Sequence, residues 1–350
     1  MAAAAAVATQ QLVQSADGAG QIVAKAPRLL GLRSRQSSEP RVAARASQAP
    51  PEPCLPKLHR PLLAPGHPKH TTTINEVPEF LRDTFIMTGY RRLCYSYGAC
   101  VRSMAYVHNE SGNVLTHLAA LVIFAGLALS TNLNLLPAAI SPARSASWGD
   151  YLVLYGYLFS ACVCFASSTL YHTFACHSHS HHVAWLKCDF VGILVLILGS
   201  FLPGLYYGYF ESRLLMVLYM AMIASLCIAG MIISVSPHLQ KPSLRWLRPV
   251  VFFSISVSGV IPVCHHIVAH GIAASARSIG LYYMLGMVAL YAAGTLLYAF
   301  NIPERWYPGR FDIVGNSHQL FHCLVFFAAL THYYGIIQAF KWHHSAQSVL

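Results

Sequence analysis

The chain has 350 residues, of which 55% are hydrophobic and only 10% are charged. A soluble domain carries about 25% charged residues, so this chain has too little charge to cover the surface of one to three soluble domains. The composition also excludes a disordered protein, a collagen and a cysteine-stapled secreted module, and it indicates a membrane protein.

The first part of the chain is basic and shows no sustained periodicity. The net charge is +11, and thirteen of the 23 Lys and Arg residues lie before residue 113. No groove-reading motif accompanies these charges, so we expect no nucleic-acid partner. Residues 1–75 are rich in Ala, Pro, Ser and Arg, which predicts a disordered, cytosolic N-terminal tail. They lack the apolar core of a secretory signal, whereas a mitochondrial transit peptide is an open alternative because the segment is poor in acids.

Residues 76–112 differ from the tail, because large apolar side chains such as Phe80 and Phe85 mix with Arg82 and Arg91. This mixture is typical of an amphipathic helix that lies at the membrane surface in front of the first span. A short helix that packs against the rest of the protein fits the same pattern, and the sequence does not separate the two.

Seven long apolar stretches follow, within residues 113–340. Each contains the roughly 20 residues that cross a hydrocarbon core about 30 Å thick at 1.5 Å per residue. Their connections are short, which predicts an all-α membrane protein with a seven-transmembrane helix bundle and a short tail at 341–350. The stretches run near 114–138, 150–175, 184–208, 213–234, 247–270, 278–300 and 314–340.

The basic residues predict the orientation of this bundle. Seven crossings put the two termini on opposite sides of the membrane. The connections on the side of the N-terminus, together with Arg91, Arg92 and Arg102, hold nine Lys and Arg residues, whereas the other side holds four. The positive-inside rule therefore predicts a cytosolic N-terminus and an extracellular or lumenal C-terminus, in the plasma membrane or an endomembrane.

Ionisable side chains inside the expected spans indicate a functional site, because they are costly in lipid. His318 and His322 are four residues apart, so they share one face of a helix that enters from the cytosolic side. His172, Ser168 and Asp189 lie near the cytosolic ends of two other spans. At 1.5 Å per residue, all five residues lie about 5–12 Å from the same boundary, in one layer.

Three histidines in one layer predict a Zn²⁺ site near the cytosolic side of the membrane. His172, His318 and His322 would leave the fourth position to water, as catalytic zinc does. Zinc lowers the pKa of such a water to about 7. Asp189 is then expected to hold or deprotonate the water, and Ser168 to orient the water or a substrate carbonyl. Hydrogen bonding between helices, without a metal, is the open alternative for the histidines.

Four motifs follow one another along the chain. They are Ile86-Met-Thr-Gly-Tyr-Arg91, Glu110-Ser-Gly-Asn113-Val-Leu-Thr-His117, Ser168-Thr-Leu-Tyr-His172 with Asp189, and Pro303-Glu304-Arg305-Trp-Tyr-Pro-Gly309 with Ser317-His318-Gln319-Leu-Phe-His322. In this order they resemble the motifs of the progestin and adipoQ receptor family, which includes adiponectin receptors, haemolysin-III-like proteins and fungal zinc-homeostasis relatives. Each motif alone is modest, whereas all four in order, over residues from about 85 to 340, are highly specific.

The resemblance implies seven helices with a cytosolic N-terminus. It also implies that His172, His318 and His322 hold zinc, with Ser168 and Asp189 around the bound water. A family motif also matches three residues before and in the first helix, which we expect to brace that helix against the site. These residues are Glu110, Asn113 and His117.

Two classes of function fit the sequence. In the first, the protein is a receptor or regulator in lipid, metabolic or zinc-homeostasis signalling, and zinc pins helices together. In the second, it is a zinc hydrolase of a lipid amide such as ceramide, an activity that the resemblance implies for some members. A transporter is weaker, because the sequence shows neither paired repeats nor broken helices. The partners to expect are membrane lipids, an extracellular protein or a steroid or lipid ligand, and a second copy of the chain.

Overall fold

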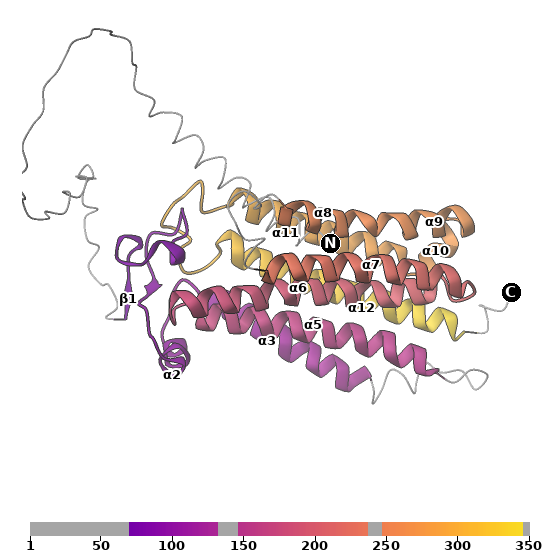
Figure 1. Ribbon diagram of the computed structural model, residues 1–350, viewed down its shortest axis with the longest axis horizontal. Coiled ribbons are helices and arrows are strands. Elements are labelled where there is room, and N and C mark those ends of the chain that lie inside the picture. Colours follow the sequence, from indigo (N-terminus) through magenta and orange to yellow (C-terminus); the bar gives the residue numbers. More distant parts are fainter. Residues whose placement is uncertain (1–69, 132–145, 237–246, 346–350) are drawn as a thin grey trace, which may run out of the picture.

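The structure of the protein is a computed structural model that describes residues 70–131, 146–236 and 247–345 (Figure 1). The expected N-terminal tail lies almost entirely outside the described residues, and so does the second half of the expected C-terminal tail. Apart from one pair of two-residue strands, every long element of the described chain is a helix.

Six helices are long and apolar enough to cross a membrane, and they coincide with six of the seven expected spans. Hydrophobic runs of about 20 residues form helices in lipid because a helix satisfies every backbone hydrogen bond within itself. The last helix continues to His343, three residues into the expected tail at 341–350. The six are α3 (Ser111–Ser130), α5 (Trp148–Phe174), α6 (His179–Gly208), α7 (Arg213–Val235), α11 (Leu281–Phe300) and α12 (Ser317–His343).

The fifth expected span, 247–270, is divided. It consists of α8 (Leu247–Ser258) and α9 (Val260–His270), and α10 (Ile272–Ser278) follows with a bend of 120°. Gly271 allows this bend, because its φ of 82° lies in the left-handed region that favours glycine. The described chain therefore has six spans, or seven if a bent pair counts as one, and it contains a helix break that the sequence does not reveal.

A single helix over 76–112 is wrong, whereas the alternative, a short helix that packs against the rest of the protein, is present as α2 (Tyr97–Arg102), which lies against α5. Pro78 and Gly89, whose φ is 82°, interrupt the segment, and Val77, Ile86 and Tyr90 pack into a small core of their own. We call residues 70–110 the pre-membrane segment. Its elements are β1 (Thr71–Thr72), η1 (Ile74–Glu76), η2 (Glu79–Leu81), β2 (Tyr90–Arg91), α2 (Tyr97–Arg102) and η3 (Ser103–Ala105), with β1 antiparallel to β2 and Thr71 opposite Arg91.

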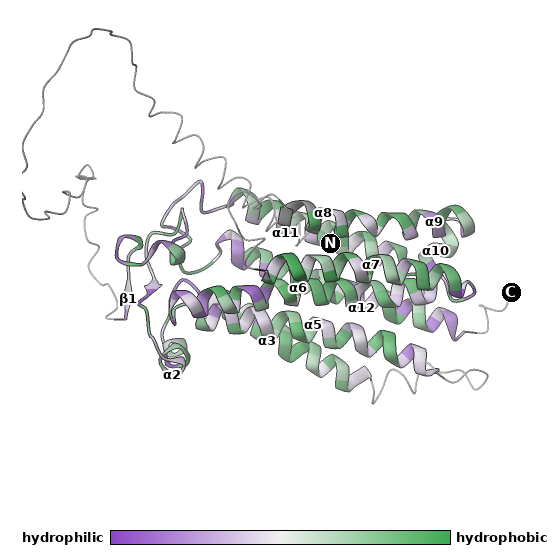
Figure 2. Cartoon of the chain, viewed as in Figure 1, coloured by the Kyte–Doolittle hydropathy of each residue, from purple (hydrophilic) through white to green (hydrophobic). Residues whose placement is uncertain are grey.

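The bundle is held by two apolar clusters. The larger one joins α3, α5, α11 and α12 around side chains such as Phe165 and Tyr333, and the smaller one joins α6, α7 and α8 around Leu194 and Ile223. Many apolar side chains also point outwards, among them Leu214, as expected of a surface that contacts lipid. Figure 2 shows that hydrophobic residues predominate along the helices of the bundle, whereas the pre-membrane segment at one end contains more hydrophilic residues.

Candidate metal centre

Three histidines meet where α5 ends and α12 begins, beside the pre-membrane segment. His172 lies in the last turn of α5, and His318 and His322 lie in the first two turns of α12. The start of α12 is well defined, because the side chain of Asn316 accepts a hydrogen bond from the Gln319 backbone N–H at 3.0 Å. These ends place all three imidazoles at one level of the bundle.

The three imidazoles are close enough to bind one metal ion. Their ring nitrogens lie within 4.8 Å of one another, and the ring centroids are 4.7–5.0 Å apart. His172 and His322 are buried and His318 is half-buried. Three histidine nitrogens at about 2.0–2.1 Å from one ion, with a fourth position open, form a common zinc arrangement.

Carboxylate and carbonyl oxygens orient two of these rings. The Nδ1 atom of His172 lies 2.8 Å from Glu110 Oε2, and the Nδ1 atom of His322 lies 3.2 Å from the Asn113 carbonyl oxygen. The Asn113 side chain in turn donates to Glu110 Oε2 at 2.7 Å. Nδ1 of His172 is thus occupied, whereas Nε2 of the same ring is buried without a hydrogen-bond partner in the described chain. An orphaned imidazole nitrogen opposite a carboxylate is what a metal-binding histidine requires.

Glu110 is placed to act as this carboxylate. It precedes α3, outside the spanning helix, and its two strongest partners are His172 and Asn113. Burial alone would raise the pKa of Glu110, but the hydrogen bonds from His172 and Asn113 and the charge of Arg91 hold it well below its usual range. Glu110 is therefore ionised next to the His172 ring.

Ser168 and Asp189 lie on the other side of the histidines. Ser168 is buried one turn before His172 on α5, and Asp189 is half-buried on α6. The Ser168 hydroxyl is buried without a hydrogen-bond partner among the described residues. Both side chains line a cavity that also touches His318 and His322. The structure thus brings the five residues of the expected site together, although α6 and α12 are far apart in the sequence.

Two cavities meet at this centre. The first has a volume of about 120 Å³, lies between α5, α6, α11 and α12, and is mainly apolar. The second has a volume of about 290 Å³ and lies beside the pre-membrane segment, where polar residues such as Asp83 and Asn109 line it. His318 and Tyr298 belong to both walls. The centre therefore lies between an apolar space inside the bundle and a polar space at its end.

His117, the third residue of the motif that contains Glu110 and Asn113, contacts the centre in a different way from these two. The His117 ring stacks on the His322 ring, with centroids 3.6 Å apart and an angle of 6° between the planes. Both His117 nitrogens are buried without a hydrogen-bond partner among the described residues. His117 thus supports His322 by ring packing and lines the apolar cavity.

Sequence reasoning missed two residues around the centre. Thr116, whose hydroxyl lies 3.3 Å from His322 Nδ1, stands inside the quoted motif and could have been found there. Asp312 accepts hydrogen bonds from the backbone N–H groups of Met87 and Thr88, at 3.0 and 2.8 Å. It thereby joins the pre-membrane segment to the connection before α12, and no spacing in the sequence indicates this contact.

Comparison with known proteins gives the family. A family profile described as haemolysin-III related matches residues 105–333. The chain belongs to this family. It is 38% identical over 261 residues to an adiponectin receptor protein of Drosophila melanogaster, and 37% identical over 266 residues to the ADIPOR-like receptor IZH1 of Eremothecium gossypii. It is also 33% identical over 271 residues to heptahelical transmembrane protein 1 of Arabidopsis thaliana.

The matched regions differ in how much of each relative they span. They cover 74–76% of this chain, but 57% of the fly protein, 82% of the Eremothecium protein and 80% of the Arabidopsis protein. The chain thus spans little more than half of the fly relative. The expected resemblance to the progestin and adipoQ receptors is confirmed, and the protein is an adiponectin-receptor-like multi-pass membrane protein.

Proposed function

We propose that His172, His318 and His322 bind Zn²⁺ and that this centre is the functional site of a receptor-like membrane protein. The proposal is supported by the orphaned Nε2 atom of His172 opposite the Glu110 carboxylate. Three imidazoles with a nearby carboxylate form a donor set that suits zinc. An N-terminus on the cytosolic side belongs to the same proposal and is supported by the excess of basic residues on that side.

We further propose that the centre hydrolyses a lipid amide such as ceramide. The observation that carries this is the position of Asp189, which lines the apolar cavity beside two of the three histidines. Zinc, when bound, supplies Lewis acidity and lowers the pKa of water to about 7. Asp189 accepts the proton that the attacking water loses, and Ser168 orients the amide carbonyl. A carbon–oxygen bond forms, the carbon–nitrogen bond breaks, and the proton passes to the leaving amine.

The two cavities suit two parts of such a substrate, an acyl chain and the hydroxyl groups next to the amide. An apolar cavity of about 150 Å³ is large enough to bind benzene, so about 120 Å³ accommodates a segment of an acyl chain next to the centre. The polar cavity is lined by Asn109, Asn113 and Asn316, among others, whose amides suit the hydroxyl groups of a head group. An amide bond between these two parts would lie at the histidines.

A receptor without catalysis is the second candidate. It is favoured by the names of relatives, since the fly and Eremothecium proteins are called receptors. In this case zinc would only fix α5 to α12, and an extracellular protein, a steroid or a lipid would be the ligand. A transporter gains one argument from the bend at Gly271, but only one such break occurs in the described chain, whereas paired broken helices are typical of transporters.

Turnover by the full chain separates the two candidates. The purified protein in lipid vesicles is incubated with ceramide, and released fatty acid is measured by mass spectrometry together with bound zinc. We expect Asp189→Asn to abolish release while zinc stays bound. Glu211→Gln, which changes an exposed carboxyl between α6 and α7, serves as the control and should act like the wild type. If no fatty acid is released from a broad panel of lipid amides, the hydrolase is excluded and the receptor without catalysis is the remaining candidate.

A further inference from the structure

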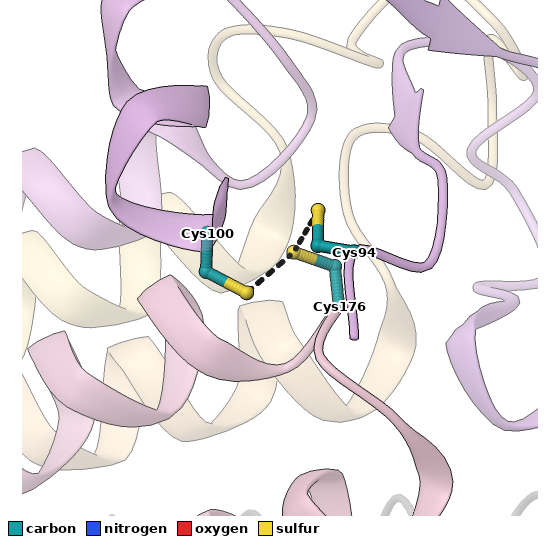
Figure 3. A group of neighbouring side chains, drawn as sticks. All are labelled: Cys94, Cys100 and Cys176. Atoms are coloured by element: carbon teal, nitrogen blue, oxygen red, sulfur yellow. Dashed lines mark hydrogen bonds between the residues drawn. The ribbon is translucent and has the colours of Figure 1, made fainter. Parts of the chain in front are cut away.

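Three cysteines form a compact cluster outside the spanning helices. Cys94 lies between β2 and α2, Cys100 lies in α2, and Cys176 follows the end of α5 (Figure 3). The Sγ atom of Cys176 lies 3.8 Å from that of Cys94 and 3.7 Å from that of Cys100. Cys100 and Cys176 are buried and Cys94 is half-buried. The cluster has no part in the function proposed above.

Backbone contacts hold the two chain segments of the cluster together. The N–H of Cys94 donates to the Cys176 carbonyl at 2.8 Å, and the N–H of Tyr95 donates to the His177 carbonyl at 3.0 Å. The Tyr97 ring packs edge-on against Phe174, with centroids 4.8 Å apart. The three thiols are therefore brought together by the fold itself, without a covalent bond.

The sulfur distances match those of a zinc site. A Zn–S bond is about 2.3 Å long, so two sulfurs on one tetrahedral zinc are about 3.8 Å apart. Two of the three Sγ pairs have this separation, and the third lies within 4.8 Å. A disulfide would instead need about 2.05 Å between two sulfurs and would leave the third cysteine unused.

A buried positive charge near the cluster also lacks a salt-bridge partner. Arg91 is 3% exposed, and its guanidinium donates only to neutral oxygens, namely the Ser103 hydroxyl and the carbonyls of His172 and Thr173. Its Nε atom has no partner, and no carboxylate pairs with it in the described chain. Buried charges normally require a partner. Zn²⁺ with three thiolates carries one excess negative charge, which the nearby Arg91 would stabilise.

We propose that Cys94, Cys100 and Cys176 form a second zinc site, with the fourth position open to water or an external ligand. This site ties the pre-membrane segment to the end of α5. Arg91 connects it to the histidine centre, because its guanidinium donates to the His172 carbonyl at 2.5 Å, in the last turn of the helix that Cys176 follows. Charge balance favours Zn²⁺ over a monovalent thiophilic ion, which would leave two excess negative charges.

Zinc content and X-ray absorption of the purified full chain test this site. We expect about two zinc ions per chain in the wild type and about one in Cys176→Ser. In a variant with His172, His318 and His322 changed to Ala, the remaining zinc should show sulfur neighbours at about 2.3 Å. If the histidine centre binds no zinc, we expect one zinc in the wild type and none in Cys176→Ser. Failure of one zinc proposal can therefore be distinguished from failure of the other.

Two further variants guard against misfolding and chance effects. Cys162→Ser, which changes a half-buried cysteine on α5 outside the cluster, should keep both ions. Cys94→Ser changes the most accessible of the three thiols and should hasten zinc loss to a chelator at least tenfold. Equal zinc content in the wild type and Cys176→Ser would overturn the proposal, and so would a disulfide among these cysteines in the freshly purified protein.

Discussion

Glu110 Oε2 lies 2.8 Å from His172 Nδ1, although the two residues are 62 positions apart. This contact joins the motif that begins α3 to the motif that ends α5. It explains why a carboxylate stands in front of the first spanning helix: it fixes the tautomer and orientation of a histidine whose other nitrogen faces the proposed metal. Asn113 completes the arrangement by binding Glu110 with its side chain and His322 with its carbonyl.

The first prediction concerns Glu110. Glu110→Ala should lower zinc affinity at the histidine centre by about 10–100-fold, because loss of such an orienting carboxylate typically has this effect. Glu110→Gln keeps a hydrogen-bond acceptor but loses the charge, so its effect should be smaller. Competition with a chromogenic chelator measures the affinity, and Glu76→Gln, an exposed carboxyl in η1, is the control. Unchanged affinity in Glu110→Ala would remove Glu110 from the centre.

The second prediction concerns the apolar cavity. Val325 on α12 is 4% exposed and lines this cavity, so Val325→Phe should fill part of it. We expect turnover of a long-chain amide to fall at least tenfold, with short-chain amides less affected and zinc retained. The overpacking itself should cost about 1–3 kcal/mol of stability. Val122→Phe on the outer face of α3, where Val122 is 64% exposed, should change neither measurement.

The third prediction is a pH dependence of stability. Burial raises the pKa of Asp83 to about 6, and the negative charges of Glu304 and Glu110 act in the same direction. The unfolded chain ionises this carboxyl near pH 4, whereas the folded chain keeps the proton up to about pH 6. The ionised group therefore destabilises the folded protein fully above about pH 6, and this penalty disappears as the pH falls to about 4.

Asp83→Asn removes this penalty. At about pH 7.5 the variant should be more stable than the wild type by on the order of 2 kcal/mol, and the difference should shrink towards zero at about pH 4.5. Thermal unfolding of the detergent-solubilised protein at both pH values measures it. Glu79→Gln, an exposed carboxyl on η2, should show no such trend. The same difference at both pH values would contradict the argument.

The fourth prediction concerns the contact between α11 and α12. Gly280 has a φ of 64°, and a Cβ atom there would lie 2.8 Å from the Gly335 carbonyl oxygen. Gly280→Ala should therefore lower stability by about 2–3 kcal/mol, from backbone strain and the forced separation of the helices. Gly126→Ala, where a Cβ meets no atom within 4 Å, should be neutral or stabilising by up to about 1 kcal/mol. Equal melting temperatures would contradict the close contact.

Much of the bundle can be predicted from the sequence, because hydropathy over 20 residues is a local property. The same holds for the meeting of His172, His318 and His322, since their depth follows from their distance to the ends of their helices. The bend at Gly271 falls in the expected connection between the fifth and sixth spans, and hydropathy does not show that a short helix, α10, forms this connection. Only the φ of 82° at this glycine in the structure reveals the bend.

Features that depend on contacts between distant segments could not be predicted in this way. Aromatic and arginine side chains occur both in surface helices and in compact loops with a core of their own, so the composition of the pre-membrane segment does not distinguish the two. Cys94, Cys100 and Cys176 have no metal-binding spacing, and only the packing of α2 against the end of α5 brings them together. The contact of Glu110 with His172 likewise depends on packing, here of the start of α3 beside the end of α5.

The most direct test of the histidine centre is the zinc content of a chain that lacks the three clustered cysteines. With Cys94, Cys100 and Cys176 changed to Ser, we expect about one zinc per chain, with nitrogen and oxygen neighbours in X-ray absorption. The additional change His318→Ala should remove this zinc, whereas His332→Ala, which changes a histidine deeper on α12, should leave it bound. Full zinc retention after His318→Ala would contradict the proposal that His172, His318 and His322 hold the metal.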